Sequence, residues 1–101
     1  MFNINDLKKV NVEQLANKNQ FLITYKNDDH EILCFQSYKS LVACWDFADK
    51  ILYVSWRYWD YSKTTLKHFK MFVNEYTDIE YKNKQDFINK IKTDQQKIVL
   101  F

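Results

Sequence analysis

Four side chains in this sequence are soft metal ligands: the thiols of Cys34 and Cys44 and the imidazoles of His30 and His68. Structural zinc sites usually draw such ligands from closely spaced pairs, and the sequence has neither a C-x2-C nor an H-x3-H unit. We therefore expect no metal ion and no other cofactor. We interpret the two cysteines as buried strand residues and the two histidines as surface residues.

Nucleophilic catalysis has equally little support in the sequence. Cys34 or Ser62 could serve as a nucleophile with His68 as its base, but no residue marks an orienting group or an oxyanion hole. Ser62 also stands where a helix needs a capping side chain. We expect that the chain is not an enzyme.

Residue types that recognise other molecules gather in residues 56–69. This segment holds two of the three tryptophans and Arg57, the single arginine. Tryptophan, tyrosine and arginine dominate binding hot spots because they bury a large area. One interpretation is an exposed patch of Arg57, Tyr58 and Trp59, with Tyr61 beside it, after a strand that ends near Trp56. The alternative is a structural ion pair of Arg57 with Asp60.

The spacing beyond this patch predicts an amphipathic helix over residues 62–76. Asp60 and Ser62 are both good N-cap residues. Apolar side chains recur at helical spacing, and Thr65 falls within their stripe, so its hydroxyl should bond a backbone carbonyl or a neighbouring side chain. The stripe consists of Leu66, Phe69, Phe72, Val73 and Tyr76.

Lys63, Lys67 and Lys70 form a basic stripe on the opposite face of this helix. Such a stripe is usually the solvated side of an amphipathic helix. The sharper interpretation is phosphate contact, with Tyr58 or Trp59 stacking on a base. Both interpretations stay open from the sequence.

The remaining pattern predicts an α+β fold with an antiparallel sheet of about four strands. The strands are expected at 21–25, 32–35, 41–47 and 51–56 as a meander, with the helix on one face and terminal segments or a partner on the other. Two short helices are expected before residue 17, after Asn5 or Asp6 and after Asn11. Asn83 should cap a second, C-terminal helix. The tail 97–101 should pack on a sheet edge or fill a dimer contact.

Composition sets further limits. A length of 101 residues suggests a single compact domain spanning 1–101. The sequence has no glycine, so left-handed turn positions should fall on Asn or Asp. A net charge of +2 permits nucleic-acid contact without arguing for it. We expect no membrane contact, no signal peptide and a cytoplasmic protein with reduced cysteines.

The string from Trp59 to Phe69 resembles a known signature, aromatic-Asp-Tyr-Ser-x-Thr-Thr-x-Lys-His/Tyr followed by a helix. That signature belongs to a small domain of unknown function common in phages and mobile elements of low-GC bacteria. Residues 35–43 are similar to the first hairpin of the same domain. The resemblance implies that domain's fold and a phage-related setting in a bacterial cytoplasm, and it implies no established activity.

Small proteins from such a setting often block host defence, so the leading hypothesis is an anti-CRISPR inhibitor. It would bind a Cas effector or its ribonucleoprotein and act sterically or allosterically. Residues 3–7 and the order of elements are also similar to one class of small Cas9 inhibitors, but the slightly basic charge argues against DNA mimicry. The alternative is a nucleic-acid-binding accessory protein of a phage, and a homodimer is also compatible with the sequence.

Overall fold

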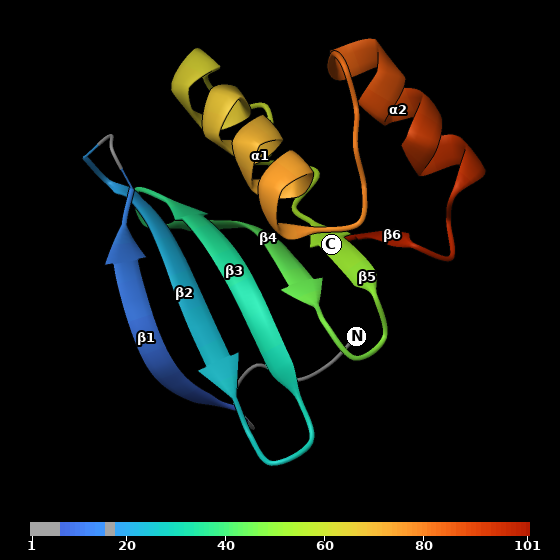
Figure 1. Cartoon of the computed structure of the whole chain (residues 1–101). Coiled ribbons are helices and arrows are strands. Elements are labelled where there is room, and N and C mark those ends of the chain that lie inside the picture. The colour runs from blue at the N-terminus through green and yellow to red at the C-terminus, as the bar shows by residue number, and fades with distance from the viewer. Residues whose placement is uncertain (1–6, 16–17) are drawn as a thin grey trace.

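A computed structural model of the chain, describing residues 7–15 and 18–101, has a six-stranded sheet with two helices on one face (Figure 1). Strands β1 to β5 form an antiparallel meander, and β6 pairs in parallel with β5. The elements are β1 (Lys8–Gln14), β2 (Gln20–Lys26), β3 (Glu31–Ser37), β4 (Ser40–Asp46), β5 (Ile51–Val54), α1 (Lys63–Tyr76), α2 (Lys84–Thr93) and β6 (Ile98–Leu100).

The α+β class and the four-stranded meander are confirmed, as β2 to β5, but the sheet is larger than predicted. The tail at residues 97–101 does pack on the sheet edge, as β6. The helix predicted after Asn11 is wrong, because this segment is β1, and Val12 of β1 pairs with Ile23 of β2. Val10 and Val12 alternate with polar residues, which is a strand period. The start of the helix predicted after Asn5 or Asp6 lies outside the described residues, but its continuation to Val10 is wrong, because β1 begins at Lys8.

Successive strand residues point to opposite faces of the sheet, and both faces contain buried residues. The face under the helices packs Leu22, Phe35, Ala43, Trp45 and Leu52 together with apolar residues of both helices. The opposite face buries Ile23, Ile32, Cys34, Cys44 and Tyr53, flanked by partly buried neighbours such as Leu7 and Val99. The helices therefore cover one of the two apolar faces in the described part of the chain.

Strand β5 ends at Val54, two residues before the predicted end at Trp56. The backbone N–H groups of Tyr58 and Trp59 both donate to the carbonyl of Ser55, at 3.2 and 3.0 Å, which turns the chain away from the sheet. Residues 56–60 are consequently a turn that leads into α1.

Both helices begin at the predicted capping residues. The Ser62 side chain accepts the N–H of Thr65, and the Asn83 side chain accepts the N–H of Asp86. Phe69, Phe72 and Val73 of α1 are buried, as the predicted stripe requires. No helix among the described residues is long and apolar enough to cross a membrane.

Within residues 7–15 and 18–101 of this glycine-free chain, three residues adopt positive φ angles: Asn19 at 67°, Tyr38 at 56° and Lys50 at 55°. The prediction that such positions fall on Asn or Asp is right for Asn19 and wrong for the other two. Tyr38 belongs to a two-residue hairpin loop between β3 and β4, and the favoured hairpin turns require positive φ. A left-handed residue with a Cβ atom costs about 1–2 kcal/mol.

Candidate functional site

An open pocket of about 610 Å³ lies between the β3–β4 turn, the turn after β5 and the first turn of α1. It brings residues of the segment 37–42 together with residues of the segment 57–65. Its lining consists of Ser37, Tyr38, Lys39, Ser40, Val42, Arg57, Tyr58, Tyr61 and Thr65. We call it the tyrosine pocket.

Hydroxyl groups form the buried part of the tyrosine pocket. The Oγ1 atom of Thr65 lies 2.9 Å from Oγ of Ser37 and 3.1 Å from Oγ of Ser62. Ser37 and Thr65 are both buried, so their side chains hold the start of α1 against the end of β3. The predicted bond of the Thr65 hydroxyl to a neighbouring side chain is confirmed.

Three tyrosine rings and one guanidinium form the exposed part of the pocket. Tyr61 is 75 % exposed and Tyr38 is 57 % exposed, while Tyr58 is half-buried. The rings of Tyr58 and Tyr61 meet edge to face at 6.3 Å, and the Arg57 guanidinium lies over the Tyr58 ring at 5.3 Å. Lys39 and Arg57 are the charged residues of the lining, so the pocket is electropositive.

Trp59 does not belong to this exposed surface, contrary to the predicted patch. It is 1 % exposed, and its ring packs against Phe69 at 5.6 Å and Phe87 at 5.2 Å. The exposed tryptophan is Trp56, at 53 %. Trp59 therefore joins the turn to both helices, and it cannot stack on a nucleic-acid base from this position.

The predicted ion pair of Arg57 with Asp60 is wrong. Asp60 instead binds Lys84, with 2.8 Å between Oδ2 and Nζ, and the same Lys84 ammonium lies 5.8 Å from the Trp59 ring. This contact ties the turn to the first residue of α2. Arg57 is left on the surface beside Tyr58.

His68 is buried at 2 % exposure, so its predicted place on the surface is wrong. Neither ring nitrogen has a hydrogen-bond partner within the described structure. Burial, followed by the charge of Lys67, lowers the pKa of His68 below its usual value. Neither Ser62, which bonds Thr65, nor Cys34, which contacts Cys44, makes a hydrogen bond to the His68 ring.

The predicted basic stripe on α1 is only partly free. Lys63 and Lys67 are exposed, but Lys70 donates to the carbonyl of Lys82 and lies 6.0 Å from the Tyr81 ring. A second groove, of about 290 Å³, runs between α1 and the start of α2. Its lining includes Lys63, Lys67, Lys70 and Lys84 and no acidic residue.

The two cysteines are buried on neighbouring strands, as predicted. Cys34 and Cys44 face each other across β3 and β4, with 2.8 Å between their sulfur atoms. The thiol–thiol contact, together with burial, raises the pKa of Cys44. Both cysteines lie on the face away from the helices, so they do not join His68 on α1.

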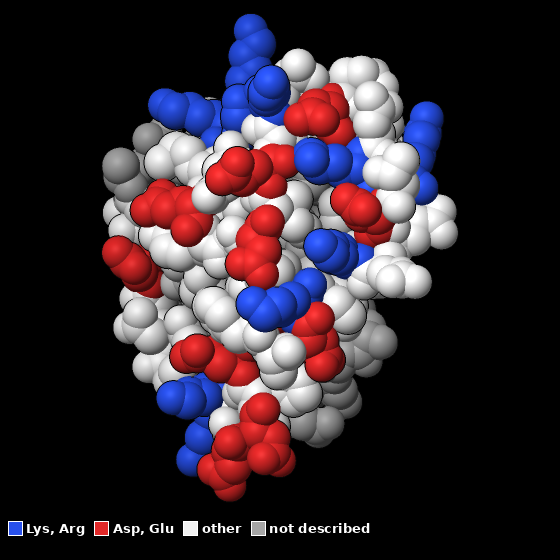
Figure 2. All heavy atoms as spheres, turned by 45° about the vertical axis from the view of Figure 1, so that its right-hand side comes forward, with Lys and Arg blue, Asp and Glu red and all other residues white. Residues whose placement is uncertain are grey.

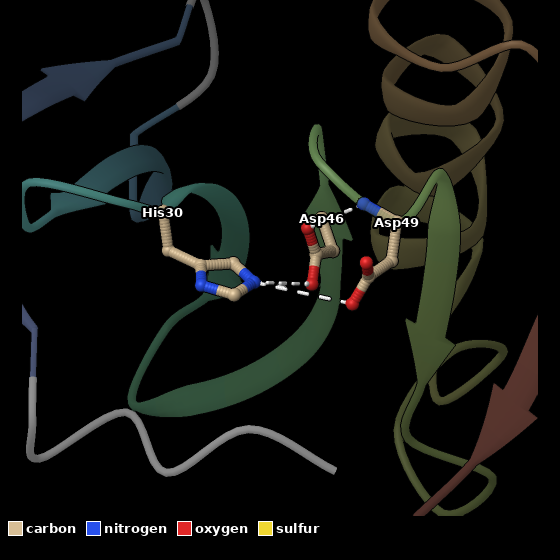
Figure 3. Close-up of side chains that lie close together, drawn as sticks. All are labelled: His30, Asp46 and Asp49. Atoms are coloured by element: carbon tan, nitrogen blue, oxygen red, sulfur yellow. Dashed lines mark hydrogen bonds and ion pairs between the residues drawn. The ribbon is translucent and has the colours of Figure 1, made fainter.

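Sequence reasoning missed one group of side chains that could ligate a metal ion, His30, Asp46 and Asp49 (Figure 3). His30 lies in the turn before β3, Asp46 is the last residue of β4 and Asp49 lies in the turn after it, and no familiar motif spacing marks them. The sequence could have indicated this group. In a meander every second turn lies at the same end of the sheet, so the β2–β3 turn, with His30, and the β4–β5 turn, with Asp49, are expected to be close. The charges of Asp46 and Asp49, after burial, raise the pKa of the neighbouring Tyr53.

The fold and the tyrosine pocket define a small α+β domain with an electropositive aromatic surface. The chain belongs to a family of unknown function (DUF8033), whose sequence profile matches residues 9–90. This range contains β2 to β5, α1, the tyrosine pocket and most of α2. No curated protein and no solved structure matches the chain.

Proposed function

We propose that this chain is a protein-binding module that uses the tyrosine pocket as its contact surface. The observation that carries the proposal is the gathering of Tyr38, Tyr58, Tyr61 and Arg57 around one open pocket. Tyrosine and arginine side chains contribute most of the energy in many protein interfaces. With Lys39 and Arg57 as its charges, the pocket suits a partner segment that presents an acidic side chain beside an apolar one.

The buried hydroxyls of Ser37 and Thr65 support this proposal. They fix the relative positions of β3 and α1, the two elements whose adjoining turns carry the exposed rings. A rigid contact surface loses less conformational entropy on binding than a mobile one. We therefore expect the pocket to bind its partner without a large rearrangement of β3 and α1.

We further propose that the partner is a bacterial defence protein, with a Cas effector or its ribonucleoprotein as the first candidate. The support is the resemblance of residues 59–69 to a domain of phages and mobile elements. Basic and acidic side chains are interspersed over the face that comes forward in Figure 2. Such a mixed surface suits steric or allosteric inhibition by protein contact and does not imitate the uniform charge of DNA.

A plasmid-interference assay tests the proposal. In bacteria with an active CRISPR–Cas system, expression of the chain should raise the transformation efficiency of a targeted plasmid by at least about tenfold. The double variant Arg57→Ala, Tyr61→Ala should abolish this gain, because both side chains are exposed and central to the pocket. Met71→Ala is the matched control, since Met71 is 45 % exposed on α1 and does not line the pocket.

Two results would overturn the proposal. One is failure to protect the plasmid against every CRISPR–Cas type tested while the chain is present at normal levels. The other is full protection by the double variant, which would place the contact elsewhere on the surface. Circular dichroism of the purified variants shows whether both fold.

The groove between α1 and α2 favours a second candidate, a nucleic-acid-binding accessory protein. Lys63 and Lys67 are exposed there and have no acidic neighbour in the lining. Phosphate contacts made by lysine give an affinity that falls steeply with salt concentration. Filter binding to DNA and RNA at two salt concentrations, with the double variant Lys63→Gln, Lys67→Gln, distinguishes this candidate. This candidate would be excluded if the affinity for nucleic acid did not fall with salt concentration, or if the double variant bound as tightly as the original protein.

A further inference from the structure

Three potential ligand atoms, from His30, Asp46 and Asp49, converge (Figure 3). They lie at the end of β3 opposite the tyrosine pocket. His30 precedes β3, Asp46 is the last residue of β4, and Asp49 lies in the turn before β5. Nε2 of His30 is 3.4 Å from Oδ2 of Asp46 and 3.9 Å from Oδ2 of Asp49. All three ligand atoms lie within 4.8 Å of one another.

The Asp46 carboxylate is fixed and nearly fully buried. It is 1 % exposed, and its Oδ1 atom accepts the N–H groups of Ala48 and Asp49 at 2.9 and 3.1 Å. Its Oδ2 atom points toward the His30 imidazole (Figure 3). A buried carboxylate is costly unless a cation balances it, and an imidazole is a cation only when it is protonated.

His30 is also held in place by its turn. The side-chain oxygen of Asn27 accepts the N–H of His30 at 2.7 Å, and the Asn27 N–H donates to the His30 carbonyl at 2.9 Å. These two bonds fix the backbone from which the imidazole projects, while the bonds to Oδ1 of Asp46 orient that carboxylate in the way that outer contacts orient metal ligands. Asp49, which is 62 % exposed, leaves one side of the group open to solvent.

We propose that His30, Asp46 and Asp49 bind a divalent transition-metal ion of the zinc class. Ligand atoms about 2.0–2.1 Å from a tetrahedral zinc ion lie about 3.3 Å apart, close to the separation between His30 and Asp46. One imidazole nitrogen with two carboxylate oxygens suits zinc, cobalt or manganese better than calcium or magnesium, which prefer oxygen ligands alone. Water or a group from a partner completes the coordination.

The ion would tie the β2–β3 turn to the β4–β5 turn. Because an ion that binds only the folded state stabilises it by mass action, zinc should raise the melting temperature of the protein. This site does not depend on the tyrosine pocket, since the two lie at opposite ends of β3. Failure of either proposal therefore leaves the other standing.

The test uses the full chain without an affinity tag, freed of metal by a chelator and dialysed. Cobalt(II) should give saturable visible absorption bands at one ion per chain, and zinc(II) should compete for the same site and raise the melting temperature. His30→Gln and Asp49→Asn should each weaken binding by at least about tenfold and remove the melting shift. Asp28→Asn is the matched control, because Asp28 is an exposed carboxylate in the same turn as His30.

Any of three results would overturn the proposal. The first is cobalt or zinc titration without saturation. The second is unchanged affinity in both His30→Gln and Asp49→Asn. The third is an intense sulfur-to-cobalt band in the near ultraviolet, which would assign the ion to Cys34 and Cys44. Because Asp49 and His30 are partly exposed, these two variants test the site without removing the buried Asp46.

Discussion

His68 and Trp59 lie in the same motif, and the burial of neither could be predicted from its residue type. Both were expected on the surface, and both are buried at 2 % exposure or less. Trp59 fits its site because three aromatic rings surround it, whereas His68 brings two polar nitrogens into a site without partners among the described residues. An unpaired buried polar group costs about 1–3 kcal/mol.

Burial of His68 predicts that stability falls in mild acid. The folded-state pKa of His68 is lowered, so the unfolded chain binds more protons than the folded chain just below the ordinary imidazole pKa of about 6.5. The contribution of His68 to the free energy of unfolding is therefore fully present above that value. It decreases as the pH falls toward the lowered folded-state pKa. Urea denaturation at pH 7 and pH 5 measures the difference.

The variant His68→Leu isolates this effect from other titrating groups. Leucine has a similar volume and no polar atom, so the variant should be as stable as the original protein at pH 7 or slightly more stable. Its advantage should grow at pH 5. An equal loss of stability on acidification in both proteins would show that His68 is not the responsible group.

At the scale of elements, α1 was predictable from the sequence and the turn before it was not. Ser62 and the apolar stripe depend on local chemistry, which a sequence displays directly. The position of Trp59 depends on Phe87 of α2, 28 residues away, and the partner of Asp60 is Lys84. Contacts between distant segments leave no periodic signal, so the exposed patch was assigned to the wrong tryptophan.

Replacing the N-cap of α1 tests how far this local chemistry contributes to stability. Ser62→Ala should lower the free energy of unfolding by about 1 kcal/mol, because the N–H of Thr65 loses its acceptor. The Thr65 hydroxyl keeps its contact with Ser37. Chemical denaturation followed by circular dichroism provides the measurement.

Ser62→Asp is the control for this variant, since aspartate is also a good N-cap. It should stay within about 0.5 kcal/mol of the original protein. If Ser62→Asp lost as much stability as Ser62→Ala, the serine would matter for the hydrogen bond that its hydroxyl donates to Oγ1 of Thr65 and not for capping.

At the scale of the molecule, the C-terminal segment completes the sheet. After α2, the chain returns to place β6 beside β5, and the backbone N–H of Leu52 donates to the carbonyl of Lys97. Ile98 is 3 % exposed and joins the core under the helices. The sequence indicated a strand at this end because four of its last five residues are apolar, but it could not distinguish a sheet edge from a dimer contact.

Two substitutions in β6 measure how much the packing of this strand contributes to the stability of the fold. Ile98→Ala should lower the free energy of unfolding by about 2–5 kcal/mol, because it leaves a cavity in the core. Leu100→Ala, at a position 41 % exposed, should change it by no more than about 0.5 kcal/mol. Guanidinium denaturation of both variants provides the measurement, and equal effects would show that β6 is not docked in this register.

The opposite edge of the sheet has a different character. All seven residues of β1 are exposed, and the pairing with β2 is interrupted between Lys9 and Asn11. Irregular pairing and lysine side chains both discourage another strand from adding to an edge. A strand from a second molecule that approached β1 would meet an irregular strand and the ammonium groups of Lys8 and Lys9. We therefore expect this edge to resist the addition of strands from further copies of the chain, even though Val10 and Val12 face the solvent.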